Sequence, residues 1–246
     1  MPIEALLLIS LIFFTALLFS SVGHGGASGY LAAMALLGVA PIEMRPAALV
    51  LNIFVASIAV YKFYRAGAFS LDLFLPLALT SIPAALIGGT LSLPSHIYKP
   101  IIGAALLLAA WHVFSHAKRV DSEALNKVSK PVLLGVGAGF GLLSGLTGIG
   151  GGVFLSPLLL FFKWGETKVI SGVAAAFILV NSISGLIGVL IKTPMLPSAL
   201  PYWVVAAILG GLIGAEFGSR HFSNPSIRKV LALVLLLAGS KMLLSG

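Results

Sequence analysis

The sequence is mostly a series of apolar segments, and this pattern limits the fold more than any other feature. A helix of about 20 apolar residues crosses the ~30 Å hydrocarbon core of a bilayer. The chain is 59% hydrophobic and only 9% charged, which is more apolar surface than one soluble core of 246 residues could bury. We therefore predict an all-α integral membrane protein. The apolar segments are 5–22, 27–38, 46–63, 72–91, 98–115, 131–147, 152–163, 169–190, 200–220 and 227–245.

These segments form two halves of five, which we expect to be repeats. Residues 1–116 and 131–246 are the predicted transmembrane repeats, and the polar run 117–130 is the predicted linker. An odd number of segments in each half would give the two repeats inverted topology, an arrangement found in transporters that bind their substrate near the midplane. The glycines that support the repeat are Gly23, Gly25 and Gly26, which correspond to Gly148, Gly150 and Gly151.

The positive charges predict the orientation, because cytoplasmic loops of membrane proteins carry an excess of Lys and Arg. We count all ten segments as membrane crossings; treating the first two of each half as a re-entrant hairpin gives the same result. Of the 15 Lys and Arg residues, eleven then lie on one side of the membrane and four on the other. We therefore expect a multi-pass protein of the cell inner membrane, with both termini outside and the linker in the cytoplasm. The eleven are Lys62, Arg65, Lys118, Arg119, Lys127, Lys130, Lys163, Lys168, Arg220, Arg228 and Lys229; the four are Arg45, Lys99, Lys192 and Lys241.

Two glycine-rich breaks interrupt the apolar pattern, at 21–26 and 146–152. Backbone that leaves the helical conformation inside a membrane must be buried in protein or line a watery cavity, and paired breaks in two halves indicate a transport site. The segments after the breaks, 27–38 and 152–163, have 12 residues each, or ~18 Å of helix. Either they cross a locally thinned region, or they are the return arms of hairpins.

The breaks precede helix N-termini, where free amides and the positive end of the helix dipole favour anions. Successive glycines also allow amides to form an anion-binding nest. The alternative is that the glycines serve only tight packing or a sharp turn. The predicted substrate-binding residues lie in the breaks or in polar positions near them: Ser21, Gly23, His24, Gly25, Gly26, Ser28, Asn52, Ser144, Thr147, Gly148, Gly150, Gly151, Gly152 and Asn181.

Ionisable side chains are scarce near these breaks. His24 is the only one at a break, and its ordinary pKa of about 6.5 suits either anion binding or proton transfer; a neutral structural histidine is the alternative. Arg45 either guides anions from outside or is an ordinary interfacial arginine. Glu216 precedes a span end with Arg220 four residues later, so we expect an ion pair between them. Metal-ligand spacing, a nucleophile motif and paired inward carboxylates are missing from the sequence, so we predict no enzyme, metal or cofactor.

The second break resembles a known family. Residues 148–159 read G-I-G-G-G-V-F-L-S-P-L-L, which is similar to the G-x-G-G-G-x-x-x-x-P-x-L element of the TauE/SafE sulfite exporter family, also called the toluene sulfonate uptake family. The first break departs from this element, because it contains His24, lacks the third glycine and has Ala32 where the second has Pro157.

The resemblance implies a secondary transporter in the lipid bilayer that moves sulfite, sulfoacetate or another sulfonate, driven by a gradient of protons or another coupling ion. An anion channel of the same fold is the first alternative. The second is a non-transporting membrane assembly protein whose glycines serve packing alone. No nucleic-acid partner is predicted, because positive charge in such a chain reports topology.

Overall fold

The computed structural model describes residues 3–91, 94–115, 125–192 and 195–220, together with 236, 240 and 243. Nine of the ten predicted segments are helices within these ranges, with ends that agree to within five residues; the tenth, 227–245, lies largely outside the described residues. The helices are α1 (Ile3–Ser20), α2 (Ala27–Leu36), α3 (Pro41–Arg65), α4 (Leu71–Thr90), α5 (Ser95–Ser115), α6 (Lys130–Thr147), α7 (Gly152–Phe161), α8 (Thr167–Lys192) and α9 (Leu200–Arg220).

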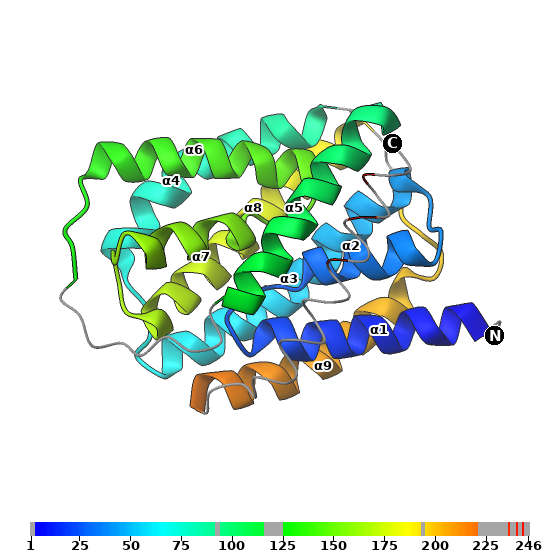
Figure 1. Cartoon of the computed structure of the whole chain (residues 1–246), viewed down its shortest axis with the longest axis horizontal. Coiled ribbons are helices and arrows are strands. Elements are labelled where there is room, and N and C mark those ends of the chain that lie inside the picture. The colour runs from blue at the N-terminus through cyan, green and yellow to red at the C-terminus, as the bar shows by residue number, and fades with distance from the viewer. Residues whose placement is uncertain are drawn as a thin grey trace.

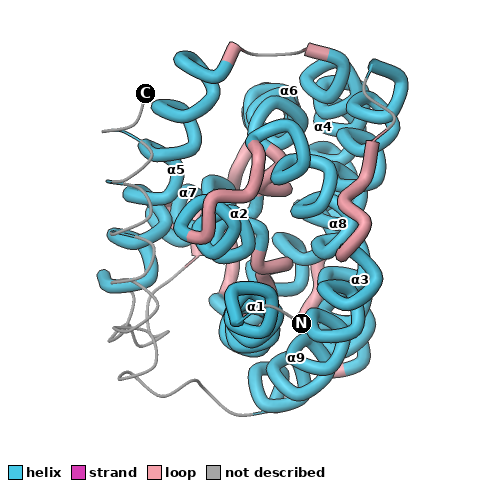
Figure 2. Tube along the Cα trace, turned by 90° about the vertical axis from the view of Figure 1, so that its right-hand side faces the viewer, coloured by secondary structure: helices cyan, strands magenta, loops and turns pink. Residues whose placement is uncertain are grey.

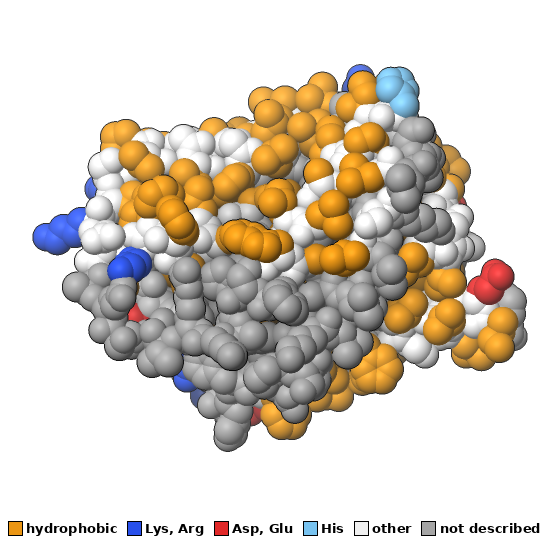
Figure 3. All heavy atoms as spheres, in the orientation of Figure 1, with side chains coloured by type: hydrophobic (Ala, Val, Ile, Leu, Met, Phe, Trp, Pro, Cys, Tyr) orange, Lys and Arg blue, Asp and Glu red, His pale blue; other side chains and the backbone are white. Residues whose placement is uncertain are grey.

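The helices have the lengths and surfaces of a multi-pass membrane protein. Among the described residues, six are long and apolar enough to cross a bilayer: α1, α3, α4, α6, α8 and α9. Their outward side chains include many large apolar ones, such as Leu79 of α4 and Phe14 of α1. Hydrophobic side chains cover much of the upper part of the face in Figure 3, while Lys and Arg side chains show mainly toward its left-hand edge. The prediction of an all-α membrane protein is therefore confirmed.

Each short helix is the return arm of a hairpin. In Figure 1, α1 runs from the N-terminal end of the molecule to its middle and α2 turns back, while α6 and α7 form a similar hairpin from the opposite end. Both α2 and α7 have 10 residues, or about 15 Å of helix, which is half the hydrocarbon thickness. Of the two expectations for these segments, the structure therefore shows the hairpin.

The outer arm of each hairpin packs against a helix from the other half of the chain. Viewed along the bundle, α6 lies beside α4 and α1 lies beside α9, with α2 and α7 in the interior and α5 on a separate side (Figure 2). Glycines allow the backbones to touch: a Cβ on Gly141 would overlap the carbonyl of Ser81, and one on Gly214 would overlap that of Leu17. These contacts are the small-residue seams common between membrane helices.

Buried apolar side chains form one cluster around each short helix. The larger cluster surrounds α2 and draws on α1, α3 and α9, with Tyr30, Met34 and Trp203 among its members. The second surrounds α7 and draws on α4, α6 and α8, with Leu155 and Phe177 among its members. The first break therefore leads into a helix that is almost wholly buried, and the second into one that is buried along one face.

One ion pair joins the two halves at the end of the bundle where α3 and α9 terminate. Lys62 of α3 binds the carboxylate of Glu216 on α9, and both side chains are about one third exposed, at 31% and 36%. The sequence pointed to Arg220 as the partner of Glu216, but the Arg220 side chain lies outside the described ones. The partner that the structure shows comes from another helix, which spacing along one helix cannot reveal.

Candidate functional site

The two breaks turn through left-handed glycine conformations at matching positions. Gly23 has a φ of +75° and its counterpart Gly148 has +79°. Gly26, the N-cap of α2, has a φ of +96°, and its counterpart Gly151, the N-cap of α7, has +77°. Residues with side chains rarely adopt such angles. The backbone paths therefore match at these two pairs and differ at the third, because Gly150 is also left-handed, with a φ of +83°, while its counterpart Gly25 is not.

Asn52 of α3 links the two breaks. Its side chain is fully buried, and its Oδ1 accepts a hydrogen bond from the N–H of Ala27 at the start of α2, at 3.1 Å. Its Nδ2 donates to the carbonyl of Ile149 in the second break and to the hydroxyl of Ser182 on α8, both at 3.3 Å. One side chain thus binds the backbone at both hairpin tips.

Gly25 and Gly150 approach Asn52 so closely that neither position has room for a side chain. A Cβ on Gly25 would overlap Asn52 Oδ1, and one on Gly150 would lie 2.6 Å from Asn52 Nδ2. The same two Cβ atoms would lie 3.0 and 2.9 Å from Cγ2 of Ile178 on α8. The two tips therefore meet where α3 packs against α8.

Each break also contacts the start of the long helix from the other half. Gly23 lies against Ser171 of α8, and Gly148 lies against Arg45 of α3. The Arg45 guanidinium binds carbonyls at the C-terminal ends of α4 and α6, where a cation is favourable. Arg45 is therefore an anchor for these helix ends, and its role as an anion guide stays a prediction. The acceptors are Gly145, Leu91 and Gly89 at 2.9 Å and Gly88 at 2.6 Å.

Several buried amides at the tips donate no hydrogen bond to any described residue. Buried N–H groups are nearly always paired with protein, water or a ligand, because an unpaired one costs about 1–3 kcal/mol. Their concentration at two adjoining helix N-termini gives this part of the molecule a strong capacity to bind an anion. The amides belong to Gly25, Gly26, Ser28, Gly29, Gly150, Gly151 and Val153.

The C-terminal ends of α1 and α6 reach the same tips, and their carbonyls carry the opposite partial charge. Turn amides bind these carbonyls. Phe19 accepts hydrogen bonds from the N–H groups of Val22 and His24, at 3.1 and 2.9 Å, and Ser144 accepts one from Gly148 at 2.9 Å. These carbonyls therefore have backbone donors, whereas the seven amides named above have no acceptor among the described residues.

His24 belongs to one tip and reaches the other. Its side chain is 6% exposed, its Nδ1 lies 3.1 Å from the carbonyl oxygen of Val22, and the ring also meets the backbone of Gly152 in the second break. Its predicted roles in anion binding or proton transfer stay predictions. Within the described ranges, no three His, Asp or Glu residues gather in a group that could hold a metal ion.

Comparison with known proteins decides the family. Residues 8–242 match the family described as Sulfite exporter TauE/SafE. The chain belongs to this family. It is also similar to the "Probable membrane transporter protein y4hK" of Sinorhizobium fredii, with 39% identity over 246 residues that cover 99% of this chain and 100% of the relative. No solved structure matches the chain. The resemblance based on residues 148–159 is therefore confirmed, and the TauE/SafE family supports a membrane transporter.

In this TauE/SafE chain, the structure brings most of the predicted ligands to the joined tips. Three further side chains donate to carbonyls of their own segments: Ser21 to that of Leu18 at 2.7 Å, Thr147 to that of Leu143 at 2.6 Å and Asn181 to that of Phe177 at 2.7 Å. Thr147 Oγ1 also accepts from the N–H of Ile149 in the second break, at 3.3 Å. The residues that meet at the tips are Gly23, His24, Gly25, Gly26, Asn52, Gly148, Gly150, Gly151 and Gly152.

Two predicted serines stand out by their unused hydroxyls. Ser28, in the first turn of α2, and Ser144, which packs on Gly151, are buried, and neither Oγ has a hydrogen-bond partner among the described residues. Each therefore adds a buried hydroxyl beside the amides of one break. Asn181 Oδ1 is also buried without a described partner, and Phe177, to which this residue bonds, packs against Gly151.

Two residues of this TauE/SafE site are not among the predicted ligands. Tyr30 of α2 donates its hydroxyl to the carbonyl of Gly25 at 2.8 Å, and Ser182 of α8 accepts from Asn52. A single tyrosine among the small residues of segment 27–38 was a signal for the first. Ser182 is a polar neighbour of Asn181 in the sequence, but it contacts the site only because α3 and α8 pack together.

Proposed function

We propose that this TauE/SafE protein is a secondary transporter of a small sulfur-containing anion, such as sulfite, sulfoacetate or another sulfonate, across the cell inner membrane. The anion is held at the joined hairpin tips by backbone amides of both breaks, with the Ser28 and Ser144 hydroxyls beside them and His24 between them. A proton or another ion supplies the driving gradient. These assignments extend the family's general activity as membrane transporters to a substrate class and a site.

The observation that carries the proposal is the group of buried amides without described acceptors. They lie at the N-termini of two helices whose tips share the Asn52 side chain. Sulfonate and sulfite oxygens accept hydrogen bonds, and helix N-termini bind such groups in proteins of many folds. In a membrane interior, an unpaired amide is more costly than in a soluble protein, so a ligand with several acceptor oxygens would remove a large penalty.

The helix contacts between the two halves come in matching pairs, and this supports inverted repeats. Helix α4 packs along α6 as α9 packs along α1, and α4 packs against α8 as α9 packs against α3. At the tips, Gly23 contacts Ser171 as Gly148 contacts Arg45. Contacts that exchange in this way are expected of two repeats related by a twofold axis. The two hairpins enter from opposite ends of the molecule (Figure 1), as expected if one repeat is inverted relative to the other.

The charge distribution supports a cytoplasmic position for one end of the bundle. In Figure 1, α3 and α7 end and α6 and α8 begin toward the left-hand end. Basic residues at these helix ends all belong to the larger charge group counted in the sequence, so we infer that this end faces the cytoplasm. They are Lys62, Arg65, Lys130, Lys163 and Lys168.

A binding panel followed by a flux measurement tests the function. Purified protein is heated with sulfite, sulfate, thiosulfate, sulfoacetate or taurine, and we expect a sulfite or sulfonate to raise the melting temperature, since a ligand that binds only the folded state stabilises it. Uptake of the stabilising anion into proteoliposomes should then saturate and respond to an imposed ion gradient. Flux that neither saturates nor responds to the gradient would favour a channel, and an unresponsive melting temperature across the panel would favour an assembly protein.

A further inference from the structure

We propose that Tyr30 is a positioning residue for the anion: its hydroxyl fixes the Gly25 carbonyl and thereby aims the Gly26 amide into the site, with Asn52 doing the same for Gly150. The inference rests on the proposed function and assigns to two side chains a role in preparing the backbone for its ligand. In this assignment Asn52 acts through the breaks instead of touching the anion.

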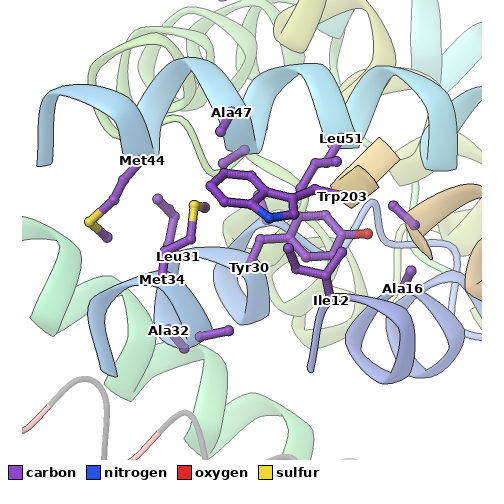
Figure 4. Packing of buried hydrophobic residues seen from close by; sticks show 14 of the residues in the cluster. Ile12, Ala16, Tyr30, Leu31, Ala32, Met34, Met44, Ala47, Leu51 and Trp203 are labelled. Carbon is purple, nitrogen blue, oxygen red and sulfur yellow. The ribbon is translucent and has the colours of Figure 1, made fainter. Parts of the chain in front are cut away.

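Tyr30 is held rigidly in the core around α2. Its side chain is completely buried, and Figure 4 shows its ring beside Trp203 and Ile12. The hydroxyl donates to the Gly25 carbonyl at 2.8 Å, and it would lie 2.6 Å from a Cβ on Gly26. Because packing fixes the Tyr30 ring, its hydroxyl holds the Gly25 carbonyl in one orientation.

The geometry of the peptide bond transfers this constraint to the next amide. A trans peptide is planar, and its C=O and N–H groups point in opposite directions. Because the Gly25 carbonyl points at Tyr30, the Gly26 N–H points away from Tyr30. That N–H is buried and has no acceptor among the described residues. The bond from Tyr30 therefore leaves the amide available and prevents the glycine pair from rotating it elsewhere.

The second break has an equivalent arrangement with a different side chain. Asn52 Nδ2 binds the Ile149 carbonyl at 3.3 Å, so the Gly150 N–H, in the same peptide plane, points away from Asn52. This amide also has no acceptor among the described residues. Position 155, which corresponds to Tyr30 in the repeat, is Leu155, so the first break has its own hydroxyl while the second depends on Asn52.

Sequence allows the amides in question to be observed selectively. With glycine labelled at both the carbonyl carbon and the nitrogen, a carbonyl–amide correlation spectrum shows only glycines that follow a glycine. The chain has five such amides: Gly26, Gly89, Gly151, Gly152 and Gly211. Three lie in the breaks, while Gly89 and Gly211 lie inside α4 and α9 and serve as internal controls. The carbonyl frequency paired with Gly26 reports the Tyr30 bond directly, because that carbonyl belongs to Gly25.

The test compares wild type, Tyr30→Phe and Ser184→Ala with sulfoacetate as the probe. The control removes a bond of the same kind, since the Ser184 hydroxyl donates to the Ile82 carbonyl at 2.6 Å in the buried α4–α8 contact. Both variants lose one hydroxyl–carbonyl bond made by a buried side chain. In wild type, sulfoacetate should shift Gly26 and Gly151 while Gly89 and Gly211 stay in place. Tyr30→Phe should shift the Gly25 carbonyl and weaken binding about tenfold, and Ser184→Ala should do neither.

The outcomes separate this inference from the proposed function. A wild-type protein in which none of the five signals responds to sulfoacetate, sulfite or any other member of the panel overturns the anion site and the inference together. A wild type that binds, with Tyr30→Phe binding equally well, overturns the role of Tyr30 alone. Equal weakening in Tyr30→Phe and Ser184→Ala would mean a general loss of packing and would also overturn it.

Discussion

Replacement of Gly150 by alanine tests whether the two hairpin tips are joined as the structure shows. Gly150 has a φ of +83°, and an L-residue in the left-handed region costs about 1–2 kcal/mol. The new Cβ would lie 2.6 Å from Asn52 Nδ2, so the carboxamide must move. That movement breaks its bonds to Ile149 and Ser182, at about 1 kcal/mol each. The expected loss in the free energy of unfolding is roughly 3–4 kcal/mol.

The control is Gly139→Ala in α6, where no atom lies within 4 Å of the added Cβ. Alanine is favoured over glycine inside a helix by about 0.5–1 kcal/mol, so this variant should be as stable as wild type or more stable. Thermal unfolding in one detergent compares the two variants, and titration with sulfoacetate should show that only Gly150→Ala loses affinity.

A double-mutant cycle isolates the contact with Asn52. Asn52→Ala removes the carboxamide that the new Cβ would strike, so Gly150→Ala in that background keeps the backbone cost of about 1–2 kcal/mol and the close contact with Ile178 Cγ2, but no longer the cost of the two broken Asn52 bonds. The coupling between the two sites should therefore be about 2 kcal/mol. Equal costs in both backgrounds, or a stable Gly150→Ala protein that binds with wild-type affinity, would refute the joined tips.

Three further predictions concern orientation, His24 and Arg45. Because the chain has no cysteine, single cysteines at Lys127 and Ser198, both exposed, can be labelled in intact cells; Ser198→Cys should react from outside and Lys127→Cys only after permeabilisation, and the reverse would contradict the orientation. If a protonated His24 helps to bind the anion, affinity for methanesulfonate should fall as pH rises from 5.5 to 8.5, by about one to two powers of ten, and His24→Gln should flatten the curve; a flat wild-type curve would leave His24 a structural role. Arg45→Lys replaces the rigid guanidinium that binds four carbonyls with an ammonium group that cannot bind all of them, so the free energy of unfolding should fall by about 1–3 kcal/mol. Unchanged stability with weaker binding would instead support an anion guide.

The sequence predicted the helices and breaks well because their signals are local. Length and apolar composition located nine of the helices, and repeated glycines located both tips. Glycine with positive φ is needed in a turn wherever the fold places it, so the pairs Gly23 with Gly148 and Gly26 with Gly151 could be identified without a structure.

The rest could not be read from the sequence because it depends on contacts between distant residues. Asn52 was selected as a ligand, but only the packing of α3 against α8 shows that its polar atoms bind Ala27, Ile149 and Ser182. The ion pair of Glu216 with Lys62 joins two helices, and the spacing of Glu216 and Arg220 along α9 gives no indication of it. Segment length alone also could not decide between the two arrangements of the short helices, since a helix that crosses a thinned bilayer and the return arm of a hairpin have the same number of residues.

The glycine seams have a consequence for how the molecule could change shape. They fasten α1 to α9 and α6 to α4, so each hairpin is tied, backbone against backbone, to a helix encoded in the opposite half of the chain. A carrier that rocks one complete repeat against the other would have to separate both seams. If α1 and α9 travel together, and α4 and α6 likewise, the seams stay intact while the tips slide past Asn52. The moving bodies would then be composites of both repeats, and neither half of the gene would encode one of them alone.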